Sequence, residues 1–287
     1  TEEQLPRIQE PGSVAGALLP GPAAELGVPP GVPVCVGAND QIVGAVGAGN
    51  VRPGIASETT GTALALVATT ETLREGRGLC VGHHAVPGLS FAMAFANTSG
   101  IVLKWLRDLA APGESYEAFL AGAAAVPPGC DGLTLLPHFA GTATPSFNPD
   151  ARGAISGLTL AHTRAHLARA ILEACACILQ ECIAEVGNQG TAITRVRSLG
   201  GAARSDLWLQ IKADLLGIPV ERPVCSDAAS LGAAILAAAG TGAFRSIREA
   251  AEAWYRAAIT FEPDASRHAA YQEVYQRYTA LYQQLYG

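Results

Sequence analysis

The sequence predicts an α/β protein, and three observations lead to this prediction. Short apolar runs rich in β-branched residues alternate with longer segments of helical periodicity. Hydrophobic residues make up 49% of the 287 residues but aromatic residues only 6%, so small aliphatic side chains must build the core. Charged residues account for only 15% and glycine and alanine are abundant, a composition of a folded globular chain and not of a disordered one. The length allows one large domain, or one domain with part of a second.

The first half of the chain is predicted to hold most of the strands. Residues 1–33 are rich in proline and glycine and resemble a linker with one short helical piece at 22–26. A buried strand is expected at 33–37 and a helix of small residues at 42–49. Two strands within 55–70 should be joined by a turn at Thr59–Thr62. Further strands are expected at 79–81, 90–96 and 133–136, and helices at 100–109 and 115–125.

Helical signals dominate the second half, after a long loop at 139–153. The strongest helix runs over 162–186, where apolar residues recur at 3.6 spacing and Thr163 stands near the N-cap. A strand at 196–199 ends in the turn Gly200-Gly201. The remaining expected elements are a helix at 205–216, an extended segment at 219–223, a helix at 226–239 and an amphipathic helical tail at 267–285.

Charge and hydropathy exclude two classes of partner. The net charge is -6 and lysine occurs only at Lys104 and Lys212, so no basic surface for nucleic acid is expected. No apolar run approaches the ~20 residues that span a bilayer and the first residues are acidic and polar, so neither a membrane span nor a signal peptide is expected. The chain begins without methionine, after which a proline-rich lead precedes the first predicted strand, and we interpret it as a fragment.

The seven cysteines have two interpretations. Cys175, Cys177 and Cys182 share one predicted helix and could form part of a zinc site. However, no C-x-x-C pair and no paired histidine ligands accompany them. We favour small buried residues in a reducing environment, which predicts a cytoplasmic protein without a protein-ligated metal.

Asp40 is a candidate catalytic residue because it follows a strand and opens a helix. A carboxylate in that position can accept the proton of a substrate hydroxyl as it attacks phosphorus. The same position suits an N-cap aspartate that satisfies free backbone N–H groups. From this segment alone, the N-cap is the better-supported interpretation.

Two glycine-containing segments could bind an anion or a flat ring. In Thr59-Thr60-Gly61-Thr62, backbone N–H groups and hydroxyls could contact a phosphate, although from this segment alone an ordinary hairpin turn is the better-supported interpretation. Gly200-Gly201, between a strand and a helix, permits close approach of a ring or a phosphate. The sequence contains neither a full G-x-G-x-x-G pattern nor a Walker A loop. Any ATP must therefore be bound in another way.

In their order and context, these segments resemble the FGGY carbohydrate kinases, and most closely the xylulokinases, over nearly the whole chain. The run 34–49 is similar to the family segment that carries the catalytic aspartate, and Gly61-Thr62 to the Gly-Thr that contacts phosphate. Residues 137–159, which include Gly141, are similar to the long interdomain loop. Residues 199–205 with Trp208 resemble the signature at the adenine pocket, and 227–234 the helix that follows it.

The resemblance implies a ribonuclease-H-like fold of the actin/hexokinase ATPase type, with the active site in a cleft between two domains. Residues 1–48 would be the end of the first, sugar-binding domain, and 49–287 the second, nucleotide-binding domain. The implied reaction is phosphorylation of xylulose, or of a related ketose or polyol, by ATP with Mg²⁺. Asp40 would be the general base and Gln41 would help to hold the substrate. Nucleotide or phosphate contacts are implied for Gly61, Thr62, Gly141, Gly200, Gly201, Ala202 and Ser205.

Two departures from the family pattern leave alternatives open. Ala140–Pro145 replaces the usual Ser-Gly-Glu-Arg-Thr-Pro of xylulokinases, so the sugar could also be another ketose or a polyol such as glycerol. The family's N-terminal Asp-Gly-Thr phosphate loop has no counterpart, so the expected partner is a missing N-terminal domain and the chain alone should be inactive. A nucleotide-binding regulatory protein of the same fold, or another ATPase of that fold, is the alternative. The tyrosine-rich tail also leaves a homodimer open.

Overall fold

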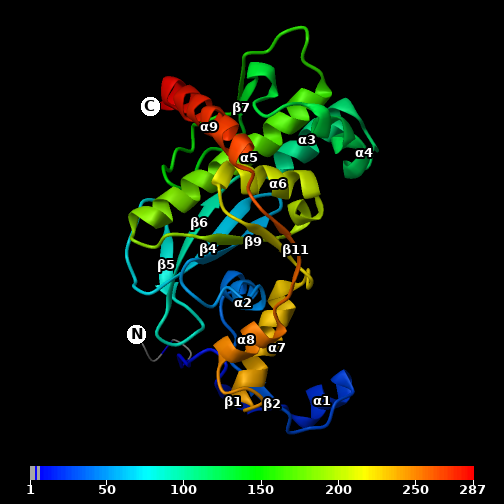
Figure 1. Cartoon of the computed structure of the whole chain (residues 1–287). Coiled ribbons are helices and arrows are strands. Elements are labelled where there is room, and N and C mark those ends of the chain that lie inside the picture. The colour runs from blue at the N-terminus through cyan, green and yellow to red at the C-terminus, as the bar shows by residue number, and fades with distance from the viewer. Residues whose placement is uncertain (1–3, 5–6) are drawn as a thin grey trace.

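The computed structural model describes Gln4 and residues 7–287, and its centre is a mixed seven-stranded sheet (Figure 1). The strand order is β11-β10-β9-β3-β4-β6-β5. Strands β3, β9 and β10 run parallel, whereas β4, β6, β5 and β11 are antiparallel to their neighbours. A group of antiparallel strands extended by parallel strands agrees with the expected ribonuclease-H-like architecture. The bounds are β3 (Ile55–Thr60), β4 (Leu64–Thr70), β5 (Cys80–His83), β6 (Ser90–Ala96), β9 (Arg195–Leu199), β10 (Val220–Pro223) and β11 (Ala257–Phe261).

Helices cover both faces of this sheet, because side chains alternate between the faces along each strand. On one face, Leu64 and Leu66 join a large core with α3, α5, α6 and α9. On the other face, Val67 contacts a second core built from α2, α7 and α8. The bounds are α2 (Asp40–Gly47), α3 (Gly100–Ala110), α5 (Arg164–Asn188), α6 (Asp206–Leu216), α7 (Ala228–Gly240), α8 (Ile247–Trp254) and α9 (Ala265–Tyr286).

The N-terminal segment folds into a small unit of its own, so the expectation of a linker there is wrong for the described residues. It consists of β1 (Val14–Ala17), α1 (Pro20–Leu26) and β2 (Pro33–Cys35), with β1 antiparallel to β2. All four residues of β1 are exposed, so this strand has no alternating pattern that a sequence could reveal. The start of the expected linker, at residues 1–3, 5 and 6, lies outside the described residues.

Most expected elements are present, with shifted ends. The helix expected at 115–125 is instead α4 (Tyr116–Ala121) followed by a 3₁₀ turn at Gly122–Ala125. The long helix begins at Arg164 with Thr163 as its N-cap, as expected. Besides β1, one α-helix and two strands were not expected, namely helix α8, strand β8 (Ala154–Ser156), which pairs with β7 (Thr134–Leu136), and the edge strand β11.

Candidate active site

A cavity of about 820 Å³ lies where β3 and β9 end, within the size range of small-molecule sites. The turn after β3 forms one wall, and the segment from Gly201 to Trp208 forms another. Helices α3 and α4 close the third side. The structure thus joins two of the sequence-predicted segments, which are about 140 residues apart, in one site. The lining residues are Thr60, Gly61, Thr62, Gly100, Ile101, Leu103, Lys104, Tyr116, Glu117, Leu120, Ala121, Ala124, Gly201, Ala202, Arg204, Ser205, Asp206, Leu207 and Trp208.

The turn Thr60–Thr62 is held tightly between its neighbours. The backbone N–H of Ser99 donates to the carbonyl of Thr62 at 3.0 Å, which fixes the turn to the start of α3. A Cβ at Gly100 would lie 2.4 Å from the carbonyl oxygen of Gly61, so only glycine fits there. The hydroxyl of Thr62 bonds to no residue that the structure describes, and Gly61 and Thr62 are both exposed. This turn therefore presents backbone and hydroxyl groups to the cavity.

Gly200 and Gly201 serve different purposes in the second wall. Gly200 has φ +79°, and a Cβ there would lie 3.0 Å from the carbonyl oxygen of Thr60. It thereby brings the end of β9 close to the Thr60–Thr62 turn, although it does not line the cavity itself. Gly201 has no atom within 4 Å of where a Cβ would stand, so it leaves the cavity open. Ser205 caps α6 by accepting from the N–H of Trp208 at 3.3 Å.

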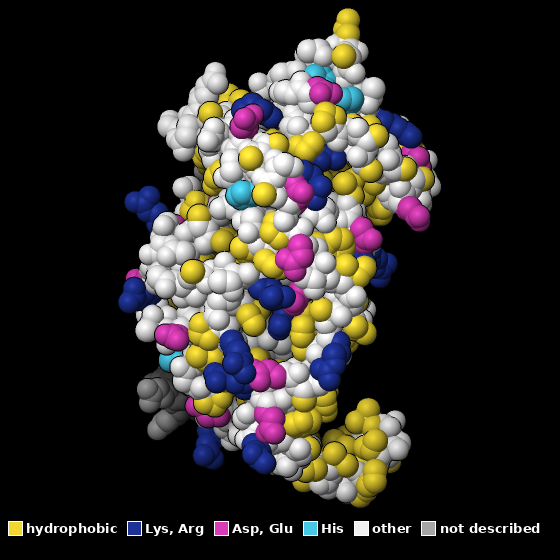
Figure 2. All heavy atoms as spheres, in the orientation of Figure 1, with side chains coloured by type: hydrophobic (Ala, Val, Ile, Leu, Met, Phe, Trp, Pro, Cys, Tyr) yellow, Lys and Arg dark blue, Asp and Glu magenta, His cyan; other side chains and the backbone are white. Residues whose placement is uncertain are grey.

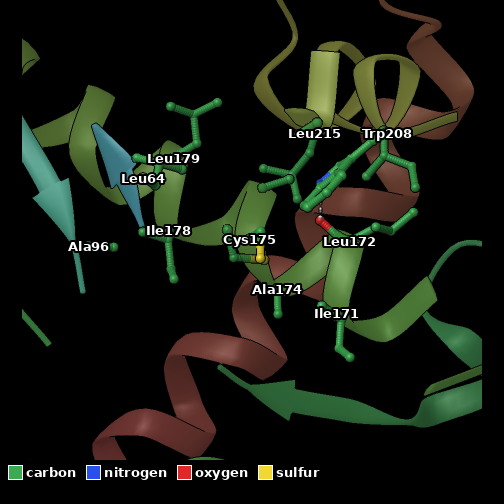
Figure 3. Packing of buried hydrophobic residues seen from close by; sticks show 14 of the residues in the cluster. Leu64, Ala96, Ile171, Leu172, Ala174, Cys175, Ile178, Leu179, Trp208 and Leu215 are labelled. Atoms are coloured by element: carbon green, nitrogen blue, oxygen red, sulfur yellow. Dashed lines mark hydrogen bonds between the residues drawn. The ribbon is translucent and has the colours of Figure 1, made fainter. Parts of the chain in front are cut away.

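The rest of the cavity is largely apolar and includes the buried ring of Trp208. Its indole Nε1 donates to the carbonyl of Leu172 at 3.2 Å, and this bond holds the ring against α5 (Figure 3). Leu120 and Leu207 add aliphatic surface from α4 and α6. A pocket with a fixed aromatic ring, aliphatic walls and polar groups at one end suits a ligand with a flat ring and a charged tail.

Sequence reasoning missed several polar residues of the site. Lys104 and Arg204 line the cavity, as do the carboxylates Glu117 and Asp206. Lys212, the second of the two lysines, lies beneath the cavity and donates to Thr60 Oγ1 at 3.1 Å. The rarity of lysine was the one available signal, since both lysines border this site.

Asp40 and Gln41 do not line this cavity. Their helix α2 lies on the face of the sheet opposite α3 and α6, packed against α7 and α8. The N-cap of α2 is Asn39, whose Oδ1 accepts from the N–H of Gln41 at 3.0 Å. The N-cap interpretation of Asp40 is therefore wrong. Asp40 is exposed and its carboxylate accepts only the neighbouring N–H of Gln41, at 2.8 Å, among the described residues.

Gly141 also lies apart from the main cavity. It lines a cavity of about 80 Å³ with Thr142, Glu181 and Tyr282 among its neighbours. Its φ is +78°, and a Cβ would lie 2.8 Å from the carbonyl oxygen of Asn148. The closure of its own loop therefore explains why a glycine stands there.

In the part of the chain that the structure describes, no three His, Cys, Asp or Glu side chains group closely enough to hold a metal ion. Phosphate-bound Mg²⁺ is usually held by phosphate oxygens, waters and one or two carboxylates. The carboxylates of Glu117 and Asp206 on the cavity wall fit that donor set. Within Gln4 and residues 7–287, no helix combines the length and apolarity needed to cross a membrane.

Comparisons with known proteins place the two walls of the cavity within one protein family. Residues 56–241 match the model of the FGGY family of carbohydrate kinases, C-terminal domain. Xylulose kinase of Staphylococcus epidermidis is 33% identical over 282 residues, covering 97% of this chain and 57% of that protein. Glycerol kinase of Ralstonia nicotianae is 39% identical over 252 residues, covering 84% of this chain and 49% of that protein.

Solved structures show the same relationship. The xylulose kinase from Rhodospirillum rubrum has a TM-score of 0.89 and 35% identity, and covers 98% of this chain and 57% of that chain. That from Brucella ovis has a TM-score of 0.91 and 29% identity, and covers 99% of this chain and 58% of that one. The chain thus spans about half the length of the proteins it matches. Because the family model covers both β3 with its turn and the glycine segment after β9, the chain belongs to the FGGY family of carbohydrate kinases.

Proposed function

We propose that this chain is the nucleotide-binding part of a kinase that transfers a phosphoryl group from ATP to a hydroxyl of a small sugar or polyol. The observation that carries the proposal is the single cavity in which the Thr60–Thr62 turn faces the segment Gly201–Trp208. Xylulose is the favoured acceptor, because the relatives named xylulose kinase match 97% and 96% of the chain, whereas those named glycerol kinase match between 80% and 94%.

The residues of the cavity suit an adenine nucleotide in one orientation. The ring of Trp208 and the side chain of Leu120 would border the adenine. Gly201, Ala202 and Ser205 would border the ribose, while the backbone of Gly61 and the hydroxyl of Thr62 would hold the phosphates. Mg²⁺, where bound with the nucleotide, would neutralise the negative charge that develops during transfer.

Asp40 is our candidate for the general base. It is exposed, and no cationic side chain pairs with it among the described residues. Its carboxylate is thus free to accept a proton from an acceptor hydroxyl. Since Asp40 does not line the cavity, the acceptor would lie between them, and further protein would enclose it. Gln41, half-buried beside Asp40, would help to hold the acceptor.

We further propose that residues 1–48 end a first, sugar-binding domain and that 49–287 form the second domain. The chain spans 57% of the xylulose kinase it matches. Hydrophobic atoms gather on the N-terminal unit, over α1, as Figure 2 shows. Such a patch is typical of a surface that other protein covers. The exposed residues are Ile8, Val14, Leu19, Leu26, Val28, Val32 and Val34.

Two measurements test the proposed function. Calorimetry with Mg·ADP should show binding to the chain. The substitution Gly201→Arg, whose side chain would fill the cavity, should abolish ADP binding. ADP release by the longer gene product should be stimulated by one member of a panel of ketopentoses, ketohexoses and polyols. ADP binding without stimulation by any acceptor would instead support a nucleotide-binding protein without transfer activity. No ADP binding would refute the assignment of the cavity.

A further inference from the structure

A polar cluster lies buried beneath the Thr60–Thr62 turn, and the site described so far does not use it. Its centre is an ion pair between Glu58 on β3 and Lys212 on α6, both side chains being 0% exposed. Ser198 on β9 and Thr60 at the end of β3 complete the cluster, and both are buried. Three separate elements therefore converge under the turn.

The hydrogen bonds of this cluster meet at Thr60 Oγ1, the hydroxyl of a buried residue that borders the cavity. That hydroxyl donates to Glu58 Oε2 at 2.7 Å and accepts from Lys212 Nζ at 3.1 Å. Ser198 donates its hydroxyl proton to the other carboxylate oxygen, Oε1, which also accepts from Lys212. The ammonium group lies 5.4 Å from the ring centre of Trp208, on the opposite wall.

A buried ion pair is a poor way to gain stability, because desolvation of two charges offsets their attraction. Apolar side chains of similar size would fill the same space without that penalty. The pair does fix the orientation of the Thr60 hydroxyl, because this hydroxyl donates to the carboxylate of Glu58 and accepts from the ammonium group of Lys212. Two close backbone contacts also confine the turn, because Gly100 packs against the carbonyl of Gly61 and Gly200 packs against the carbonyl of Thr60.

We infer that Glu58 and Lys212 are positioning residues that act through Thr60 to hold the Thr60–Thr62 turn in the conformation that binds nucleotide phosphates. This inference rests on the proposed nucleotide site. The Glu58–Lys212 pair should affect only the binding of the nucleotide's phosphates. The adenine and ribose end, which borders Gly201 and Ala202, should be independent of it.

Substitution of Thr60 tests this assignment with little change in side-chain volume. Thr60→Val removes the hydroxyl, whereas Thr60→Ser keeps it. Binding of Mg·ADP would be measured by calorimetry, and binding of adenosine, which has no phosphate, by NMR titration to millimolar concentration. We expect Thr60→Val to weaken ADP binding about tenfold and to leave adenosine binding unchanged, while Thr60→Ser restores most of the ADP affinity.

The ion pair is tested by removing both charges together, as Glu58→Gln with Lys212→Met, so that no unpaired charge is left buried. The matched control is Arg197→Met with Glu221→Gln. Arg197 is the neighbour of Ser198 on β9, so its side chain points to the opposite face. Its pair with Glu221, at 3.0 Å, is largely buried, with 11% and 7% of the side chains exposed.

The two pairs of variants should behave differently. The Glu58/Lys212 variant should lose ADP affinity relative to adenosine, and the Arg197/Glu221 variant should keep the wild-type ratio even where both unfold at lower temperature. An equal loss of ADP and adenosine binding, an unchanged ratio, or the same selective loss in the control would overturn the inference. Absence of ADP binding by the wild-type chain would instead refute the nucleotide site on which it rests.

Discussion

At the level of single residues, adjacent residues of identical or similar type have different roles in this protein. Gly200 needs both its positive φ of +79° and the space that a Cβ would fill, whereas Gly201 needs neither. Likewise Asn39, not Asp40, provides the N-cap of α2. Because capping is supplied by Asn39, the carboxylate of Asp40 is left for another role.

Substitution of Asp40 tests that role. In the longer gene product, Asp40→Asn should lower the sugar-dependent turnover roughly 10²–10⁴-fold, because the amide cannot accept the hydroxyl proton. Affinity for Mg·ADP should be unchanged, since Asp40 does not line the cavity. The assay is steady-state ADP release together with calorimetry.

A matched control for this change is Asp264→Asn at the N-cap of α9. Asparagine is as good an N-cap as aspartate, so this variant should be fully active. Retention of most of the turnover by Asp40→Asn would remove Asp40 from the mechanism.

Sequence reasoning missed Lys212 and Glu58 because a long-range contact defines them. Lys212 and Glu58 are separated by 154 positions, and no local pattern links them. The Thr60–Thr62 turn and the Gly200–Gly201 turn were found because glycines and hydroxyls leave a local signal. Their meeting in one cavity follows from the parallel pairing of β3 with β9, which the sequence does not display.

At the level of elements, helices α2 and α7 approach so closely that glycine is required where they cross. A Cβ on Gly47 would lie 1.8 Å from the carbonyl oxygen of Ala228. A Cβ on Gly232 would lie 1.9 Å from the carbonyl oxygen of Val43. Backbone atoms thus meet directly, and neither helix can move aside without loss of packing against the sheet.

Gly47→Ala should therefore destabilise the protein by about 3 kcal/mol or more through overpacking. Gly44→Ala, in the same helix, meets no atom within 4 Å and should be neutral or stabilising. Urea denaturation of both variants provides the comparison. Equal stability of the two would show that α2 and α7 are less closely packed than the structure has them.

Helix α9 is bound to α5 through Tyr278, whose hydroxyl bonds to Glu181 at 3.4 Å and to His138 Nε2 at 3.1 Å. Burial raises the pKa of Glu181 to about 7, against a smaller opposing effect of the Tyr278 bond. Burial also lowers the pKa of His138 to about 4. The two groups therefore respond to pH in opposite senses.

For Glu181 the folded protein holds its proton more tightly than the unfolded chain. Its contribution to stability is therefore present below about pH 4.5 and is lost as pH rises to about 7. Glu181→Gln should gain stability relative to wild type between pH 5 and 8, by at most about 3 kcal/mol. His138 titrates in both proteins, so its contribution cancels in the difference between their free energies of unfolding. A constant difference in the free energy of unfolding over that range would contradict the prediction.

The best-predicted element is long, and the elements that were missed are short or exposed. Helix α5, with a buried face along its length, was located to within two residues at each end. The edge strand β11 exposes four of its five residues and shows no alternation. Helix α8 does bury one face, with Ile247, Ala250 and Ala251, but this pattern spans only eight residues and was overlooked, and β8 has only three residues.

At the level of the whole molecule, exposed apolar residues gather at two ends. One group is the N-terminal unit β1–α1–β2, which lies at the lower end in Figure 1. The other includes Phe147, Ile155, Leu158 and Leu160, in the segment around β8. If residues 1–48 end a first domain, the rest of that domain should cover the first group and leave the second exposed.

Hydrogen exchange distinguishes the two groups. In the longer gene product, amides of residues 8–36 should exchange at least about tenfold more slowly than in this chain, because covered strands and helices open less often. Amides of 147–160 serve as the internal control and should exchange at the same rate in both proteins. Equal exchange of residues 8–36 in the two proteins would place the additional protein elsewhere and remove the support for a domain boundary near residue 48. Slower exchange of 147–160 as well would indicate a general stabilisation instead of a contact, because only a contact is confined to the surface that it buries.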